Sequence, residues 1–357
     1  MRLDKYLKLD KKIIQLSRQI KIINALEAEN SQDEKKRFLS GVIKNPQFQY
    51  RKVSCSISKV RSEINNLKIK KDSISEIYED IINRLRIKCE ILESIGDEKR
   101  IRQLSKELYG KPSKALVQEA CKLLINLDRK KESSKDKKNH TPEEAREIIK
   151  KYLKKIGING WRVILRKQHA VSVASLSKVI KISKYQMYSI NNIKLLIQHE
   201  VNGHVLRAMN GYRQPFKVFV IGLPNYLPTE EGVAIYLEEK SNLSTVKSKK
   251  RLALRVIAVD MVYKGADFRQ VFDVINDHEK DQKKCWDIAY RVFRGGGFLK
   301  DHVYLKGYLK VKKYLEEGGE LEDLYLGKYG IEQLDLIRRL HSDGILKGPR
   351  YLPEILR

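Results

Sequence analysis

The sequence lacks any apolar run approaching the roughly 18–20 residues of a membrane-spanning helix. Its N-terminus, "MRLDKYLKLDKKII", carries charges where a secretory signal peptide has an apolar segment, so we expect no export by that route. The four cysteines are scattered and form no C-x-x-C pair, which gives no support to a thiolate zinc site or a disulfide framework: Cys55, Cys89, Cys121 and Cys285. These absences predict a cytoplasmic protein without a membrane span.

No helix-turn-helix, zinc-finger or RNP-type signature of nucleic-acid binding is found either. This absence matters because the net charge is +28, from 73 lysines and arginines against 45 aspartates and glutamates. Residues 1–140 carry 34 basic and 20 acidic side chains and the rest carries 39 and 25, so each part has a net charge of +14. Two explanations stay open, an acidic macromolecular surface as partner and a general compositional bias towards lysine.

The chain is long enough, at 357 residues with 41% hydrophobic residues, to bury one large core or two moderate ones. It has no internal repeat. The polar stretch "RKKESSKDKKNH" (129–140) is the best candidate for a linker. We therefore predict two parts, an N-terminal helical region (1–140) that packs on the core, and a second region (141–357).

The first region has the periodicity of helices. Apolar residues recur at three- and four-residue steps over 57–67 and again over 74–85. Ser73-x-x-Glu76 is typical of a capping box at the start of the second helix, and a further helix is expected at about 113–127. These apolar stripes predict helix faces that pack in a core.

The second region mixes helices with a few strands. Thr141-Pro142-Glu143-Glu144 predicts a capped helix that ends near Ile156. The β-branched segments 161–167 and 171–183 predict a pair of strands, and a helix is expected at about 191–209. Two strands among many helices predict a mainly α-helical α+β fold.

Two histidines five residues apart flank a glutamate in "IQHEVNGHVLRAMNG" (197–211), in the order His199-Glu200-x-x-Gly203-His204. On a regular α-helix, residues four apart lie about 40° apart and can share a metal ion, whereas residues five apart lie about 140° apart and cannot. One local π-type turn removes this difference, and glycine best tolerates such a distortion. The spacing therefore predicts a π-bulge near residues 201–203, with both imidazoles facing one cavity.

A third ligand is expected in "LPTEEGVAIYLEE" (227–239). Thr229 is a candidate helix cap that would place Glu230 and Glu231 in the first helical turn, where the helix dipole favours negative charge. The two carboxylates would point about 100° apart, so one could be solvated while the other binds a metal. A chance arrangement of histidines is the alternative; the other five show no ligand spacing and are expected to be surface or structural residues: His140, His169, His278, His302 and His341.

Three segments, in this order, resemble the QEGLA-motif protein family, which includes the microtubule-associated tyrosine carboxypeptidases. They are "HEVNGHVLRAMNGYRQP" (199–215), "LPTEEGVA" (227–234) and "GGFLKDHVYLKG" (296–307). Weaker support comes from "NPQFQY" (45–50) and "LYGKPS" (108–113). The resemblance therefore covers most of the chain.

In that family the motif H-E-x-x-x-H and the glutamate before the glycine of Q-E-G-L-A form a zinc site, and the motif glutamate is catalytic. The resemblance implies that His199, His204 and Glu231 bind one Zn²⁺ ion, which leaves a fourth position for water. It also implies that Glu200 acts as the general base and then protonates the leaving amine.

The same resemblance implies a zincin-like (gluzincin-type) metallopeptidase core with a small β-sheet, and hence that 141–357 is the catalytic domain. The chain departs from the family pattern at Asn202-Gly203, where the family often has Gly-Thr. It also departs at Glu230 and Val233, which replace the glutamine and leucine of Q-E-G-L-A. No proposed ligand is affected, but the choice of substrate is left open.

A carboxypeptidase needs a cation for the terminal carboxylate of its substrate and a donor for the developing oxyanion. Four residues are predicted to bind the carboxylate, namely Arg207, Arg213, Arg294 and Lys300, and Tyr304 is the candidate catalytic donor. A structural salt bridge or a packing role is an open alternative for each of them. The segment 171–183, which leads into the metal helix, is expected to pair with an extended substrate.

The resulting hypothesis is a zinc-dependent metallopeptidase that removes a C-terminal residue from a protein or peptide. The alternative is a catalytically idle, basic binding or regulatory module of the same fold. Retention of Glu200 favours the enzyme, because a binding module would be free to lose this residue. A nucleic-acid-binding role ranks third.

Overall fold

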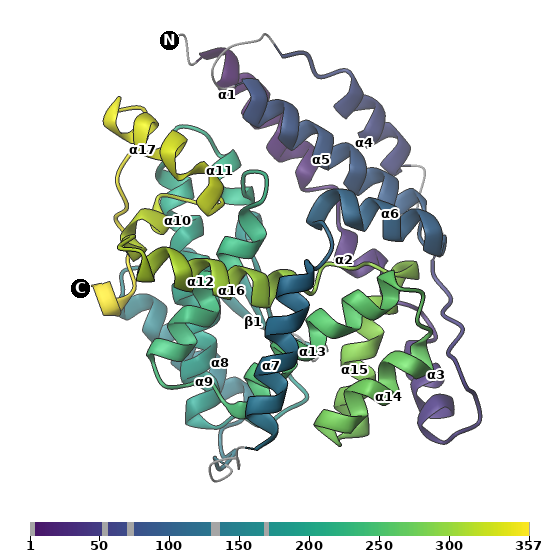
Figure 1. The fold of residues 1–357 in the computed structure, drawn as a ribbon. Helices are drawn as coiled ribbons and strands as arrows, with labels where there is room; N and C mark the ends of the chain where they lie inside the picture. Colours follow the sequence, from purple (N-terminus) through teal and green to yellow (C-terminus); the bar gives the residue numbers. More distant parts are fainter. Residues whose placement is uncertain (1–3, 52–55, 70–74, 130–135, 168–170, 357) are drawn as a thin grey trace. The chain divides into compact units, whose positions relative to one another are not determined.

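A computed structural model describes residues 4–51, 56–69, 75–129, 136–167 and 171–356 (Figure 1). These residues form helices and one small three-stranded sheet, which confirms the mainly helical α+β prediction. They divide into a sheet unit (Met1–Lys11, Glu132–Thr245 and Gly307–Arg357) and a helical unit (Lys12–Lys131 and Val246–Lys306). The division expected at residue 140 stays a prediction. In the structure the chain passes between the two units more than once.

Besides the first turn of α16 (Val303–Glu316), the helical unit contains nine whole α-helices and the end of a tenth within its described residues. They are α1 (Asp4–Ser17), which begins in the sheet unit, α2 (Ile22–Ala25), α3 (Ser31–Leu39), α4 (Ser56–Asn65), α5 (Ser75–Glu93), α6 (Glu98–Tyr109), α7 (Lys114–Asp128), α13 (Val246–Tyr263), α14 (Phe268–Glu279) and α15 (Gln282–Phe293). The apolar stripes of α4 and α5 pack together, with Ile57, Ile64 and Leu85 buried. The helix expected at 113–127 is confirmed as α7, whereas Ser73 of the expected capping box lies outside the described residues.

After the start of α1, the sheet unit continues with α8 and ends in short helical turns. Its helices are α8 (Pro142–Lys155), α9 (Ile190–Leu196), α10 (Leu206–Arg213), α11 (Val218–Ile221), α12 (Tyr226–Lys240), α16 (Val303–Glu316, from Gly307 onward) and α17 (Leu334–Ser342). Thr141 caps α8 as predicted: its hydroxyl accepts a bond from the Glu144 N–H, and the Glu144 carboxylate accepts one from the Thr141 N–H. Helix α8 packs against the sheet and so helps to hold the elements that carry the site.

The sheet has three strands, β1 (Arg162–Arg166), β2 (Ser172–Ala174) and β3 (Val179–Ser183), in the order β1-β3-β2. The expected single strand over 171–183 is wrong, because a 3₁₀ turn at Ser175–Ser177 and Lys178, with a φ of 50°, divide it into a hairpin. Strand β3 is central: it pairs parallel with β1 and antiparallel with β2. Of the segment 171–183, therefore, β2 lies at an edge of the sheet and β3 does not.

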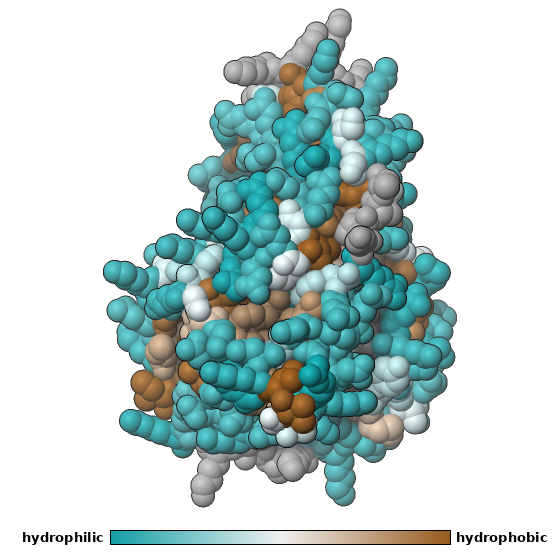
Figure 2. All heavy atoms as spheres, turned by 90° about the vertical axis from the view of Figure 1, so that its right-hand side faces the viewer, coloured by the Kyte–Doolittle hydropathy of each residue, from teal (hydrophilic) through white to brown (hydrophobic). Residues whose placement is uncertain are grey.

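The surface of the described residues is largely hydrophilic on the face shown in Figure 2, where hydrophobic side chains form small, separate patches. Across the described chain the exposed large hydrophobic residues are scattered in sequence and include Val42, Ile125 and Tyr185. None of the described helices combines the length and apolar character required to cross a bilayer.

Candidate metal centre and its surroundings

The two motif histidines lie on a π-helical segment, Ile197–Val205, which continues from α9 into α10. The wider turn brings residues five apart onto the same side, so that the rings of His199 and His204 lie 4.9 Å apart, centroid to centroid, at an angle of 80°. The buried hydroxyl of Tyr325 donates a hydrogen bond of 2.9 Å to the carbonyl oxygen of Asn202 within the segment. The predicted π-type distortion is confirmed.

Gly203 serves close packing as well as the irregular turn. A Cβ atom at this position would lie 2.7 Å from the Cβ of Ala234 on α12, nearer than real Cβ atoms approach one another. Gly232 on α12 is equally constrained, because its Cβ would lie 2.3 Å from the carbonyl oxygen of Gly307 on α16. Small residues thus let α12 lie directly against the π-helical segment on one side and α16 on another.

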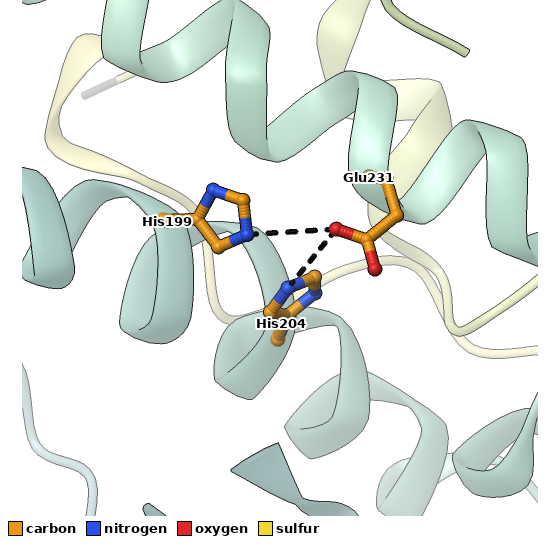
Figure 3. A group of neighbouring side chains, drawn as sticks. All are labelled: His199, His204 and Glu231. Carbon is orange, nitrogen blue, oxygen red and sulfur yellow. Dashed lines mark ion pairs between the residues drawn. The ribbon is translucent and has the colours of Figure 1, made fainter. Parts of the chain in front are cut away.

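Helix α12 presents Glu231 to both imidazoles (Figure 3). The Nε2 atoms of His199 and His204 lie 3.5 and 3.8 Å from the same oxygen, Oε2 of Glu231. One ligand atom from each of the three residues falls within 4.8 Å of the others. Two imidazole nitrogens and one carboxylate oxygen that converge in this way fit the donor set of a three-ligand catalytic metal site.

The opposite nitrogen of each imidazole contacts a carboxylate. His199 Nδ1 lies 2.6 Å from Oε1 of Glu238, and His204 Nδ1 lies 3.0 Å from Oε1 of Glu230. An Nδ1–H that donates to a carboxylate fixes the ring orientation and turns Nε2 towards Glu231. Metal-binding histidines usually make such a contact between the ring nitrogen that does not bind the metal and a carboxylate or carbonyl oxygen.

The expected cap at Thr229 is wrong. Helix α12 begins three residues earlier, at Tyr226, and the buried Thr229 hydroxyl accepts a hydrogen bond of 3.0 Å from the Ile331 N–H. Glu230 therefore lies beyond the first turn, and it is not solvated, since only 2% of its surface is exposed. The two neighbouring acids have different contacts: Glu231 faces both imidazoles, and Glu230 contacts Nδ1 of His204 from the other side of the ring.

Two cations neutralise the buried Glu230 carboxylate. Lys328 Nζ lies 2.6 Å from Oε1, and Arg207 Nη1 lies 2.5 Å from Oε2. Burial acts to raise the pKa of Glu230, but the charges of Lys328 and Arg207 and the bond from His204 outweigh it and hold the pKa far below 4.5. Glu230 is therefore a fixed negative charge that accepts the hydrogen bond from His204.

Arg207, the first candidate for binding a substrate carboxylate, has no exposed surface. Besides Glu230, its guanidinium donates to the carbonyl oxygens of Leu324 (2.8 Å) and Tyr329 (2.9 Å). These bonds occupy the donors that would hold a substrate, so we assign Arg207 a positioning role behind His204. Arg213 is half-buried and donates a bond of 2.8 Å to the Gly348 carbonyl oxygen.

Glu200 is buried near the three converging side chains. Burial raises its pKa above 4.5, although the nearby His199 and His204 act in the opposite direction. For His199, burial favours the neutral ring, but hydrogen bonds with Glu231 and Glu238 dominate and raise its pKa well above 6.5. Any metal ion bound at Nε2 of His199 must therefore displace a proton.

The remaining predicted residues belong to the helical unit. Arg294 Nη1 lies 3.3 Å from Oε1 of Glu27, and Lys300 Nζ lies 3.5 Å from the Tyr304 hydroxyl. The substrate-binding roles of Arg294 and Lys300 and the catalytic role of Tyr304 stay predictions.

Sequence reasoning missed Glu238 and Lys328. Glu238 follows Glu231 by seven residues, two helical turns, so helical periodicity could have placed both on one face of α12. No local signal identifies Lys328, which lies 98 residues from its partner Glu230 in a segment without regular helix. Its role depends on tertiary packing.

The chain is similar to known proteins over most of its length. The family model of the microtubule-associated tyrosine carboxypeptidases matches residues 35–357. Microtubule-associated tyrosine carboxypeptidase 1 from Homo sapiens is 26% identical over 235 residues, 59% of this chain and 47% of that protein. The Mus musculus protein of the same name is 26% identical over 231 residues, 58% of this chain and 47% of that protein. The matched region spans less than half of these relatives. The chain belongs to the microtubule-associated tyrosine carboxypeptidase family.

Proposed function

We propose that this protein is a zinc-dependent carboxypeptidase that removes the C-terminal residue of a protein or peptide. The observation that carries the proposal is the convergence of His199, His204 and Glu231, with each imidazole also held by a carboxylate. Family membership supports the reaction class. A binding module would have no use for a buried Glu200 beside these three residues.

The proposed chemistry uses the side chains of the candidate metal centre and Glu200. A zinc ion held by His199, His204 and Glu231 would supply a Lewis acid that polarises the scissile carbonyl and acidifies water. Glu200, whose pKa burial raises towards neutrality, accepts a proton from the attacking water. As the water oxygen bonds to the carbonyl carbon and the C–N bond breaks, Glu200 returns that proton to the leaving amine.

The proposal includes a zincin-like core of the gluzincin type. Its support is the motif helix packed against α12, which carries the third ligand, in a unit with a small sheet. Strand β2 packs near the π-helical segment and lies at the sheet edge, so its open side is the part of 171–183 that can pair with an extended peptide.

Peptide pools with free and amidated C-termini, analysed by mass spectrometry, test the reaction. The parent protein should shorten free-ended peptides by one residue and cut their amides far more slowly, because the terminal carboxylate contributes to transition-state binding. Glu200→Gln should lose about 10²–10⁴-fold in rate. The pools should vary the last side chain, tyrosine included, to establish specificity.

Three results would contradict this proposal. Internal cleavage that is insensitive to amidation would show an endopeptidase. Equal rates for the parent and Glu200→Gln would remove the assigned base. If the zinc-loaded protein cleaves no peptide in any pool, the catalytically idle binding module becomes the better account.

A further inference from the structure

A second cluster of charged residues lies in the helical unit, around the ring of Tyr304. Measured to the ring centroid, Arg255 Cζ lies at 4.8 Å, Lys300 Nζ at 5.1 Å and Arg291 Cζ at 6.0 Å. These four residues and Asp301 are called the Tyr304 cluster. Arg255 comes from α13 and Arg291 from α15, so the cluster joins residues that are distant in sequence.

The cations of the Tyr304 cluster share one carboxylate. Asp301 is fully buried; its Oδ1 accepts a bond of 3.0 Å from Arg291 Nη2, and its Oδ2 accepts one from Arg291 Nε. Lys300 Nζ lies 3.7 Å from the same Oδ1. Three cations against one carboxylate leave the cluster with two positive charges in excess.

Arg255 is the least compensated of the three cations. Its Nε atom is buried, and no hydrogen-bond partner for it is found among the described residues. Burial, and next the charge of Arg291, lower the pKa of Arg255 to about 10. A buried donor without an acceptor costs free energy, and so does a cation that shares the counter-charge of Asp301 with two other cations. A bound anion would reduce both costs.

We propose that the Tyr304 cluster is an oxyanion-binding site, which takes a carboxylate or phosphate group. The Arg255 guanidinium supplies charge and the free N–H. The Tyr304 hydroxyl, which accepts from Lys300 Nζ at 3.5 Å, has its own proton to donate to the ligand. None of the residues of the metal centre is part of this proposal, since all five residues of the cluster belong to the helical unit.

The competing explanation is that Arg255 only packs on the ring of Tyr304 as a cation–π contact. The two explanations predict opposite effects of Arg255→Gln on the protein without ligand. A packing contact would be lost and the melting temperature would fall. Removal of an uncompensated charge beside Arg291 should leave the melting temperature unchanged or raise it.

Inorganic phosphate is the probe, titrated into the full-length protein in a buffer free of other oxyanions, with calorimetry and thermal unfolding as readouts. The matched control is Lys264→Gln, which removes one positive charge from an exposed side chain of the same unit, 72% exposed and 2.7 Å from Asp260. Phosphate should bind the parent and the control with the same affinity. It should bind Arg255→Gln at least about tenfold more weakly, because a charge-assisted hydrogen bond is lost.

Equal phosphate affinity of all three proteins would overturn the proposal. The same conclusion would follow if the melting temperature of Arg255→Gln lay below that of the parent by the same amount with and without phosphate. If Arg255→Gln does not fold, Tyr304→Phe keeps the ring and should still weaken phosphate binding. The titration is repeated in His204→Ala, where binding that persists separates this site from the metal centre.

Peptides with free and amidated C-termini then distinguish the two ligand sources. Displacement of phosphate by the free-ended peptide alone identifies a terminal carboxylate as the ligand. Displacement by neither peptide identifies phosphate.

Discussion

The two buried charged clusters, one in each unit, have opposite imbalances. Around His199 and His204 lie four carboxylates, namely Glu200, Glu230, Glu231 and Glu238. They are opposed by three positive charges: Arg207 and Lys328, which pair with Glu230, and His199, whose pKa is raised well above 6.5. In the Tyr304 cluster, three cations face the single carboxylate of Asp301. Because a buried net charge is costly, an excess of negative charge favours a bound cation and an excess of positive charge a bound anion. The sign of the imbalance thus indicates the kind of ligand.

The largest expected effect distinguishes the neighbouring acids Glu230 and Glu231. Glu230→Ala would leave Arg207 and Lys328 buried without their carboxylate, so the free energy of unfolding should fall by about 3–5 kcal/mol. Glu231→Ala removes one carboxylate from a site with an excess of them, and should lose bound metal with less than about 1 kcal/mol of destabilisation in chelated protein. Denaturant unfolding and metal analysis of both variants check this.

The reverse ranking, with metal lost only in Glu230→Ala and stability lost only in Glu231→Ala, would exchange the two roles. It would also mean that α12 is rotated by one residue relative to the π-helical segment.

A second prediction concerns Asp301 and its pH dependence. Burial opposes ionisation, but the charges of Arg291 and Lys300 dominate and hold its pKa well below 3.8. A lowered folded-state pKa stabilises the protein above pH 3.8, and this contribution is lost as the pH falls below that value. Asp301→Asn should therefore cost about 1.5–3 kcal/mol at pH 7, and the difference from the parent should shrink below about pH 4.

Urea unfolding at pH 7 and at several values below pH 4 measures this difference. A difference that is constant with pH would show that Asp301 is held by packing and not by its charge. Because Asp301→Asn increases the excess of positive charge in the Tyr304 cluster, phosphate should raise the melting temperature of this variant at least as much as that of the parent.

A smaller effect is expected from Gly203→Ala. The new Cβ would lie 2.7 Å from the Ala234 Cβ, so α12 must shift away from the π-helical segment at a cost of about 1–3 kcal/mol. The same shift should move Glu231 relative to the histidines and weaken metal binding. A matched control is Gly318→Ala, where a Cβ would meet no atom within 4 Å, although a φ of +90° causes local strain there. Unchanged metal affinity in Gly203→Ala would show that the close contact does not position Glu231.

Local sequence signals predicted local structure well. The cap at Thr141, the helix after Ser113 and the π-type turn between His199 and His204 follow from spacings of a few residues, and all three are present. These features depend on hydrogen bonds within one turn, so neighbouring residues determine them.

Contacts between distant segments could not be predicted in this way. Thr229 has the sequence context of a helix cap, but its hydroxyl accepts a hydrogen bond from the Ile331 N–H. Arg207 has the charge needed to bind a substrate carboxylate, but its guanidinium is bonded to Glu230 and two carbonyl oxygens. Tertiary packing decided each of these positions.

The most direct test of the central claim is the metal content of protein purified without added zinc, measured by inductively coupled plasma mass spectrometry. We predict about one zinc ion per chain in the parent and in Glu200→Gln, which is not a ligand, and none in His204→Ala. Zinc retained by His204→Ala at the parent's level, or a parent without bound metal that also fails to take up added zinc, would contradict the assignment of His199, His204 and Glu231 as a metal centre.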